Sequence, residues 1–540
     1  MAAATMAAVR KALAVDPATR LSADRVQSIH AASLELLDDP GIWCTGERAL
    51  AVFEAGGCRT ARVSEGGRQD GYRVRIPAAV IERALESAPD EVVLGARDPA
   101  NTLVLRGKEP KVYFGTGSQA NLVLESRMAS FRSEEAPEQA AMLPVYSEST
   151  GSIAHLCRSA HLAEHLSNVD FFIRNVNAQD ESIPSEHRDV NIYFAALLHT
   201  TKHVQGGLES LEALQPMLRL AELVATDGAE PGGANPGGAN PGHADRGATG
   251  RDGSVRGLPV SFIACPVKSP LQMVADTAEK VVAIAEADVP LVISCSPQGG
   301  STAPIQEEGM VAQINAEILA GLTLAQLARP GCPVLYGAVP VRARLDNLHD
   351  FYGAPEFVHY NLGCVQMARS YGIPCYSSAG VGDAKRPGMQ ATVEKLPSHL
   401  SVAASGAQYI HYAFGLLDRT NVFSPLQAVL DDGAIGLVKQ VVRPCSFSAD
   451  DLTAAVEEIR SVARSSGVFA RRVRKQLRRG VVGDAYAFAD DGQADRVLER
   501  AQRKLEELYQ LEPRRLSDAT VDRVYAAVPG LIDRRMFDIR

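Results

Sequence analysis

The sequence predicts an α/β protein with a (β/α)8 TIM barrel, an N-terminal helical cap and a C-terminal helical extension. One pattern occurs eight times: a short apolar run ends in Gly, Ser, Asn or a polar cluster, and a longer helix-like stretch usually follows. Eight alternating strand and helix units are what a closed barrel requires, and such barrels carry their chemistry where the strands end. The apolar runs are Val112–Gly117, Phe171–Val176, Lys202–Gly207, Ser261–Pro266, Leu291–Ser296, Val334–Val339, Pro374–Ala379 and Tyr409–Phe414.

Residues 1–110 are predicted to form a helical lead-in with a small strand pair. Apolar residues recur at helical spacing from Ser22 to Asp39, and a Pro-Gly pair follows them. A second helix is expected from Ile76-Pro77 to about Ala88, because proline suits the first turn of a helix. Two strands, Glu91–Ala96 and Thr102–Leu105, are expected on either side of a turn.

The barrel is assigned to residues 111–450 and the helical extension to 451–540. Within the barrel, residues 227–257 are rich in Gly, Pro and Asn and contain a repeated Pro-Gly-Gly-Ala-Asn unit, so we expect a mobile surface insertion. The extension is predicted to hold helices at about Asp451–Ser465 and Ala494–Leu511. The basic run Arg471–Arg479 fits either a solvated helix face or a docking patch for an acidic partner.

Composition excludes several classes of protein. The chain has 540 residues, of which 46% are hydrophobic and 22% charged, as in ordinary globular proteins. Its formal net charge of −9 argues against a general nucleic-acid binder and is compatible with a cationic ligand. Nine scattered cysteines without a C-x-x-C pair indicate reduced thiols, and no apolar stretch approaches the roughly 20 residues of a membrane span. We therefore expect a cytoplasmic, soluble protein that binds neither nucleic acid nor membrane.

Polar and aromatic residues gather at the ends of the predicted strands. No H-x-H pair, H-E-x-x-H helix, G-x-S-x-G elbow or P-loop is present, which disfavours zinc catalysis and the commonest hydrolases and kinases. A single histidine at such a position is more often a hydrogen-bonded core residue than a ligand. The strand-end residues are Gly117, Ser118, Gln119, Arg174, His203, Gln298, Ser378, Asp383, His411, Tyr412 and Phe414. Tyr336 lies in the sixth strand, and Glu356 and Tyr360 follow that strand.

Six aromatic residues come from the strands or from the helices just after them. Aromatic faces that converge on a pocket attract a quaternary ammonium ion by about 0.5–2 kcal/mol each. Any one of these rings is also accounted for by packing within the barrel. They are Tyr113, Tyr336, Tyr360, Tyr376, Tyr412 and Phe414.

Several segments, taken together and in order, resemble the trimethylamine methyltransferase superfamily, specifically its members without pyrrolysine, such as glycine betaine:corrinoid methyltransferases. The resemblance covers about Leu21 to Asp432 without the insertion. The segments that carry it are Leu21-Ser22, Ile29–Leu37, Arg75–Pro77, Ala96–Pro99, Pro304, Asn315–Gly321, Pro330–Gly337, Pro355-Glu356, Tyr371–Pro374 and Asp383–Lys385, followed by Gln390 and Glu394.

The resemblance implies a (β/α)8 barrel that moves a methyl group from an amine nitrogen to the cobalt(I) of a corrinoid carried by a separate small protein. The chain has no D-x-H-x-x-G corrinoid-ligand motif, which agrees with a cofactor brought by a partner. A quaternary amine leaves as a neutral tertiary amine, so the enzyme has to orient and desolvate the cation and needs no general acid. Since only standard residues are written, a quaternary, betaine-like amine is the favoured substrate.

On this basis the candidate residues take the following roles. Glu356, which balances the charge of the cation, and His411 are assigned to catalysis, no residue is assigned to a metal, and Arg174, Lys202 or His203 would hold the carboxylate of a betaine. Substrate binding is assigned to Tyr113, Gln119, Arg174, His203, Gln298, Tyr336, Tyr360, Tyr412 and Phe414. Contact with the corrinoid is assigned to Gly117, Ser118, Ser378, Asp383 and Gln390.

The chain departs from the family pattern near the last two predicted strands. Gly388 stands where an Asp is expected, Thr392 where a Gly is expected, and Leu426 and Gly433 where acidic residues are expected. The candidate substrates glycine betaine, carnitine, choline and proline betaine fit the pattern equally. Two alternatives are a barrel acting on another methylated substrate and a non-catalytic binding protein for methylated amines. We expect a homo-oligomer, because barrels of this size often associate.

Overall fold

The computed structural model of the chain describes residues 9–63, 71–132, 140–227, 257–445, 448–465, 469, 486–489 and 496–539. Two predicted features fall outside these residues: the insertion, from 228 to 256, and the basic run Arg471–Arg479.

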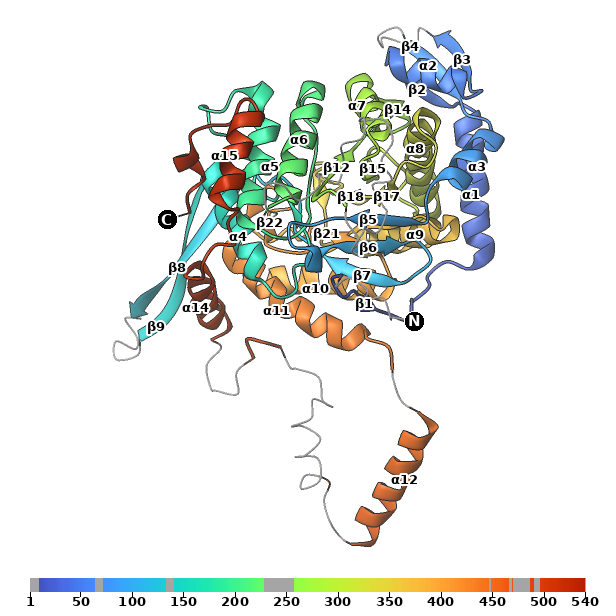
Figure 1. The fold of residues 1–540 in the computed structure, drawn as a ribbon. Helices are drawn as coiled ribbons and strands as arrows, with labels where there is room; N and C mark the ends of the chain where they lie inside the picture. The colour runs from blue at the N-terminus through green and yellow to red at the C-terminus, as the bar shows by residue number, and fades with distance from the viewer. Residues whose placement is uncertain are drawn as a thin grey trace, which may run out of the picture.

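A curled sheet of nine strands, rich in parallel pairs, forms the centre of the molecule (Figure 1). The strand order is β1-β7-β21-β20-β17-β15-β12-β11-β10, with only β1 (Leu13–Ala14) antiparallel to its neighbour. Each of the other eight strands overlaps one predicted apolar run, which confirms those eight segments as strands of one parallel series. They are β7 (Lys111–Phe114), β10 (Phe172–Ile173), β11 (Val204–Gly206), β12 (Val260–Ala264), β15 (Leu291–Cys295), β17 (Val334–Ala338), β20 (Cys375–Ser378) and β21 (Tyr409–His411).

The two ends of this parallel series approach each other. Isolated parallel bridges pair Gly115, just after β7, with Phe171, just before β10, and Ala120 with Val176. The Asp170 amide also donates to the Phe114 carbonyl at 2.6 Å.

A helix follows each of the eight strands and covers the outer face of the sheet (Figure 1). These helices are α4 (Ile153–His165), α5 (Arg188–His199), α6 (Leu214–Ala225), α7 (Ala275–Glu286), α8 (Glu307–Ala328), α9 (Pro355–Tyr371), α10 (Met389–Ala404) and α11 (Pro425–Val442). Among the described helices, α8 is the one long and apolar enough to suit a membrane span. However, 94% of that window is buried within the protein, as expected of a core helix that is apolar on all sides.

The N-terminal predictions agree with the structure for four elements. The first helix, α1 (Ala23–Asp38), is capped by the Ser22 side chain, and α3 (Ala78–Ser87) begins after Pro77. β5 (Glu91–Leu94) and β6 (Leu103–Arg106) pair as an antiparallel hairpin around a short 3-10 turn, η1 (Pro99–Asn101).

The sequence did not predict a second sheet between α1 and α3. Its strands β2 (Ile42–Cys44), β3 (Arg59–Val63) and β4 (Gly71–Arg75) surround α2 (Glu47–Ala55) and pair with β13 (Val267–Lys268) and β14 (Gln272–Met273). β2 has only three residues, and β3 and β4 are rich in arginine, so no long apolar run marks these strands. β2 also pairs with β14, which comes from the segment after β12 and is distant in sequence.

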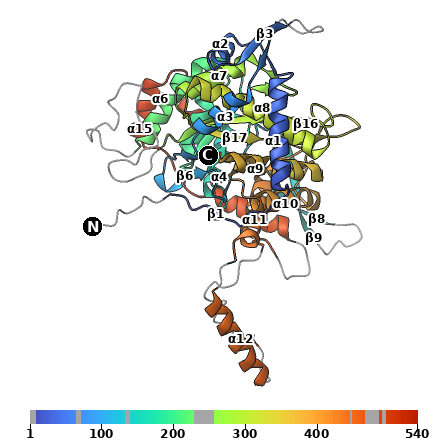
Figure 2. The same ribbon diagram turned by 90° about the vertical axis from the view of Figure 1, so that its right-hand side faces the viewer.

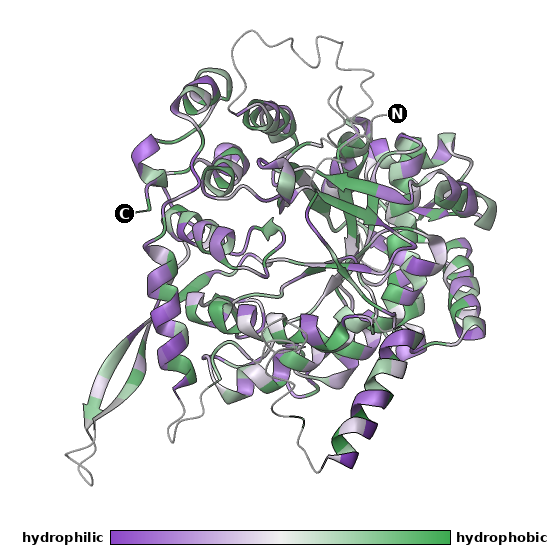
Figure 3. Ribbon diagram, turned by 60° about the horizontal axis from the view of Figure 1, so that its bottom comes forward, coloured by the Kyte–Doolittle hydropathy of each residue, from purple (hydrophilic) through white to green (hydrophobic). Residues whose placement is uncertain are grey.

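Another feature absent from the predictions is a long antiparallel ribbon, β8 (Leu122–Arg132) with β9 (Ala140–Thr150). It stands away from the body and joins a small sheet with β22 (Leu416–Leu417) and β23 (Val422–Phe423) (Figure 3). The predicted C-terminal helices are present as α12 (Ala449–Arg464) and α14 (Val497–Tyr509), and α15 (Asp518–Ala527) follows them. In two views at right angles α12 projects clear of the body (Figures 1 and 2).

Further short elements are three 3-10 helices and one small sheet. They are η2 (Ser185–His187), η3 (Leu211–Ala213), η4 (Arg534–Phe537) and a three-stranded sheet of β16 (Gln298–Gly299), β18 (Val341–Ala343) and β19 (Asp350–Phe351).

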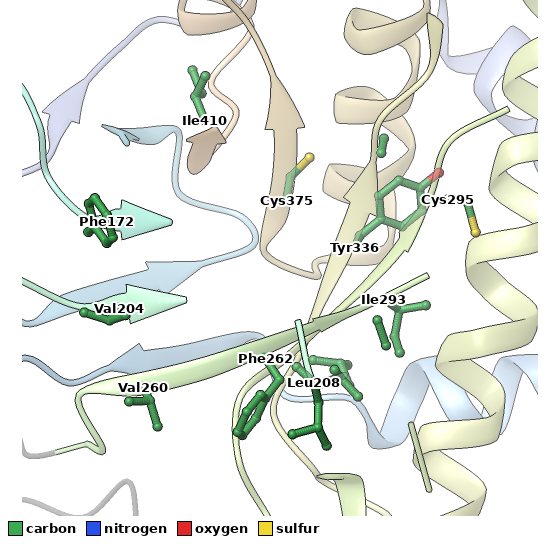
Figure 4. Packing of buried hydrophobic residues seen from close by; sticks show 14 of the residues in the cluster. Phe172, Val204, Leu208, Val260, Phe262, Ile293, Cys295, Tyr336, Cys375 and Ile410 are labelled. Atoms are coloured by element: carbon green, nitrogen blue, oxygen red, sulfur yellow. The ribbon is translucent and has the colours of Figure 1, made fainter. Parts of the chain in front are cut away.

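Each central strand presents alternate residues to two different cores. Ile293, Tyr336, Cys375 and Ile410 belong to the large core between the sheet and the helices, which Figure 4 shows from close by. Their chain neighbours Val292, Leu335, Tyr376 and Tyr409 belong to a smaller cluster with the β5–β6 hairpin. This period of two follows from strand geometry. It decides which strand residues can reach a cavity inside the curled sheet.

Three fully buried histidines make stability depend on pH. Burial lowers the pKa of His199, His203 and His399 to about 4 in each case. The unfolded chain, with histidine pKa values of about 6.5, therefore binds more protons between pH 6.5 and 4. We expect the free energy of unfolding to be largest above pH 6.5 and to fall as the pH drops toward 4, as measured by urea titration. Replacing His199 with Gln should reduce this pH slope, and an unchanged slope would contradict the assignment.

Candidate active site

A cavity of about 530 Å3 opens where the central strands end. Its walls come from the ends of β7, β10, β11, β12, β20 and β21 and from the loops around them. In barrels and other parallel sheets this edge is where binding sites form. The lining residues are Ser118, Gln119, Asn121, Ile173, Arg174, Gly206, Gly207, Ile263, Cys265, Asp350, Tyr376, Tyr412, Arg419, Thr420 and Asn421.

Strained backbone surrounds this cavity. Ser118, Tyr412 and Arg419 all have φ angles in the left-handed region, at 72°, 66° and 66°. Residues other than glycine adopt this conformation only where the surrounding structure enforces it, and such residues cluster at functional sites. Three of them around one cavity support its assignment as the site.

Two tyrosines form the aromatic wall of the cavity. The ring centroids of Tyr376 and Tyr412 lie 4.0 Å and 3.7 Å from that of His411, which is buried between them. Gly117 allows this close packing, because a Cβ there would lie 2.8 Å from Cδ1 of Tyr412. The wall therefore contains two aromatic rings, the type of side chain that attracts a cation.

His411 is neutral and supports these rings. Burial places its pKa well below the usual value. Its Nε2 lies 2.8 Å from Oγ of Ser378, and that hydroxyl is itself 3.3 Å from the Ala338 carbonyl oxygen. Nδ1 has no hydrogen-bond partner within the described parts of the chain.

The charged groups of the cavity are two guanidinium groups and one carboxylate. Arg174 is 3% exposed and pairs through Nη1 with Oε1 of Glu209 at 3.1 Å. Arg419 lies 3.5 Å from the Asp418 carboxylate. Asp350 accepts a hydrogen bond from Nε2 of Gln298 at 2.8 Å. Such a set offers guanidinium groups for an anionic group and a carboxylate for a cation.

Cys265 lines the cavity and is solvent-exposed there. Protein nevertheless surrounds the thiol, and this burial raises its pKa. A recessed position explains both facts: water enters through the mouth, while the walls disfavour the thiolate.

Some of the predicted site residues come together here. Ser118, Gln119, Arg174 and Tyr412 line the cavity. Four others lie one contact behind its wall: Gly117 and His411 against Tyr412, Ser378 against His411, and Gln298 against Asp350.

Other predicted residues lie on the helix side of the strands. Tyr336 donates its hydroxyl to Oδ1 of Asn315 in α8 at 2.9 Å, and Figure 4 shows its ring among the residues of the outer core. Tyr360 donates to the Ile305 carbonyl at 2.5 Å, and Phe414 is fully buried in the same outer core. The structure does not bring these three rings to the cavity.

A second group lies at the opposite end of the strands. Tyr113 donates to the Arg10 carbonyl at 3.2 Å, and Nζ of Lys202 donates to carbonyl groups of α4 and the residue after it. His203 lies 2.6 Å from the Gly95 carbonyl oxygen and 2.7 Å from Oγ of Ser261. Lys202 and His203 precede β11, and the Tyr113 side chain within β7 reaches back to Arg10, so all three act at the end of the strands away from the cavity.

The remaining predicted residues make local contacts outside the lining. Glu356 pairs with Arg342 at 3.4 Å near the start of α9. Asp383 accepts from the Gly353 amide at 2.7 Å, and exposed Gln390 bonds Glu394 at 2.7 Å. None of the four family departures, Gly388, Thr392, Leu426 and Gly433, is a lining residue either.

Sequence reasoning did not identify Cys265, Asp350 or Arg419, and it named Tyr376 among the candidate aromatic residues without assigning it to substrate binding. Tyr376 carried a usable signal, because strand alternation together with pairing register distinguishes it from Tyr336. Asp350 lies in the short strand β19 and Arg419 in the loop between β22 and β23, and the sequence does not reveal the path of either segment.

Comparison with known proteins identifies related sequences. The family described as Trimethylamine methyltransferase (MTTB) matches residues 2–236 and 246–481. Trimethylamine methyltransferase MttB1 of Methanosarcina mazei is 28% identical over 460 residues, covering 84% of this chain and 82% of that protein. MttB of Desulfitobacterium hafniense is 27% identical, covering 82% and 78%. The glycine betaine methyltransferase of the same species is 25% identical, covering 81% and 80%.

The exposed thiol gives a test of the cavity. Of the nine cysteines, only Cys265 and Cys445 are exposed. We expect iodoacetamide to label these two in the native protein, with Cys265 reacting faster as the pH rises because its pKa is raised. Peptide mass spectrometry would measure both rates. A ligand bound in the cavity should slow the labelling of Cys265 and leave that of Cys445 unchanged; labelling of the buried cysteines at equal rates would contradict the structure.

Proposed function

Because this chain belongs to the trimethylamine methyltransferase family, we propose that it is a methyltransferase that removes a methyl group from a small N-methylated amine. The observation that carries this proposal is the cavity at the strand ends, which combines an aromatic wall with guanidinium groups. Relatives named for trimethylamine and for glycine betaine support the class of substrate.

A betaine-like quaternary amine is the substrate that fits this cavity best. The faces of Tyr376 and Tyr412 would hold the methylated nitrogen, and Asp350 would balance part of its charge. Arg174 and Arg419 would hold a carboxylate at the other side. A simple trimethylammonium ion has no anionic group that could bind the guanidinium groups of Arg174 and Arg419, which pair with Glu209 and Asp418 within the protein.

The proposed methyl acceptor is the cobalt(I) of a corrinoid carried by a small partner protein. Such a corrinoid would supply the nucleophile. A cavity of about 530 Å3 has room for a small amine and not for a corrin ring as well, so the residues present fit an acceptor approaching from outside the mouth. The chain itself would orient the amine and exclude water. It would transfer no proton, because a quaternary amine departs without protonation and His411 is neutral.

We also propose that the central sheet closes as a (β/α)8 barrel. The parallel bridge between Gly115 and Phe171 and the 2.6 Å hydrogen bond from Asp170 to Phe114 support closure between β7 and β10. The homo-oligomer and the cytoplasmic location stay predictions; size measurement in solution would check the first.

The proposed activity has a direct test. The protein is incubated with cobalt(I) cobalamin and a panel containing glycine betaine, carnitine, choline, proline betaine and trimethylamine. Appearance of the methyl-cobalt absorption spectrum with a betaine would support the proposal. Binding without any methyl-cobalt product would instead favour a non-catalytic binding protein.

Substitution of Arg174 tests how the carboxylate is held. Hydrogen bonds to charged groups contribute about 1.5–3 kcal/mol, so Arg174→Gln should weaken glycine betaine binding roughly 10- to 100-fold by calorimetry. Choline has no carboxylate and should bind as to the wild type. Arg188→Gln is the matched control, because Arg188 also approaches Glu209, at 3.7 Å, and does not line the cavity. An equal loss of affinity for glycine betaine and for choline would argue against a contact between Arg174 and the carboxylate.

A further inference from the structure

The backbone just after Tyr412 is held by charged side chains from two helices outside the cavity. Asp431 of α11 accepts a hydrogen bond from the Gly415 amide at 2.8 Å. Lys395 of α10 donates to the Leu416 carbonyl at 3.2 Å. The two charged groups therefore fix the loop within four residues of the cavity wall.

Two further contacts fix the same loop. Nε2 of His399, one turn after Lys395, donates to the Ala413 carbonyl at 3.0 Å. The Ala413 amide donates to the Gly115 carbonyl at 3.1 Å. The segment that carries Tyr412 is thus tied both to the sheet and to α10.

Lys395 and Asp431 form a contact ion pair that is almost completely buried. Their side chains are 1% and 4% exposed, and Nε2 of Gln427 donates to the second Asp431 oxygen at 2.9 Å. Burial lowers the pKa of Lys395, and the neighbouring Asp431 opposes that shift. Removing two charges from water is costly, and an apolar pair of similar volume is often at least as stable. Stability alone is therefore a weak reason for an ion pair at this place.

Tyr412 is a residue that requires such restraint. Its φ of 66° is unfavourable for a bulky side chain and persists only where neighbouring structure enforces it. Its ring lines the cavity, so a relaxed backbone would move the aromatic wall.

We propose that the Lys395–Asp431 pair is a positioning element that holds Tyr412 in its strained conformation and so sets the affinity of the cavity for an N-methylated cation. The inference rests on the proposed function of the cavity. Lys395 and Asp431 do not line the cavity, so they would affect ligand binding only through Tyr412.

Two double variants separate positioning from folding. Lys395→Met with Asp431→Leu removes both loop contacts, whereas Lys395→Met with Asp431→Asn keeps an acceptor for the Gly415 amide. The matched control is Lys202→Met, because Lys202 is equally buried and also donates to backbone carbonyls, but at the far end of the strands.

Glycine betaine binding by calorimetry and Cys265 labelling are the two measurements. The Met/Leu variant should bind about tenfold more weakly, the effect of losing one ring from the site of a cation, and should expose Cys265 to faster alkylation. The Met/Asn variant should lie closer to the wild type, and Lys202→Met should change neither measurement.

Several outcomes would overturn the proposal. One is that the Met/Leu variant keeps the wild-type affinity for glycine betaine and the wild-type rate of Cys265 labelling. Another is that both double variants lose affinity equally, and a third is that Lys202→Met changes affinity and labelling as much as the Met/Leu variant does. If the wild-type protein binds no glycine betaine, the proposed function fails, and the labelling rates alone decide whether the pair positions Tyr412.

Discussion

Parallel pairing of eight strands within one curled sheet is the constraint on which the site depends. Parallel neighbours end at the same edge, so Ser118 and Tyr412, nearly 300 positions apart in the chain, line one cavity. The helices that return the chain cover the outer face, and their apolar packing holds the strands in register. The backbone pairing therefore decides which side chains can act together, and the side chains decide what they can bind.

The two faces of each central strand pack against different parts of the protein. Tyr336 and Cys375 pair across neighbouring strands and both face the helices, whereas Leu335 and Tyr376 face inward. A tyrosine side chain therefore faces the site at one strand position and the outer core at the next position. Arg174 and Tyr412 stand just beyond their strands, where the backbone leaves the pleat and side chains can turn toward the cavity.

The chemistry proposed for the cavity agrees with its electrostatics. Transfer of a methyl group from a quaternary nitrogen requires no proton donor, and the histidine behind the aromatic wall is neutral. Among the residues of the wall the only carboxylate is that of Asp350. A fully buried ion pair, Lys395 with Asp431, lies behind the loop, where its charges act on the backbone and not on the ligand.

The sequence by itself determined the eight strands, the helices α1, α3, α12 and α14, the β5–β6 hairpin and the family, because apolar runs, caps and motif order are local properties of the chain. It also placed Ser118, Gln119, Arg174 and Tyr412 at strand ends that line the cavity. Only the tertiary structure decided that Tyr336 and Tyr360 face the helices, that His203 lies at the far end, and that Cys265, Asp350 and Arg419 join the site. The physical reason is that the facing of a strand residue depends on register and on neighbours distant in sequence. Hydrophobic pattern shows where a strand lies, and only packing shows which way each of its side chains points.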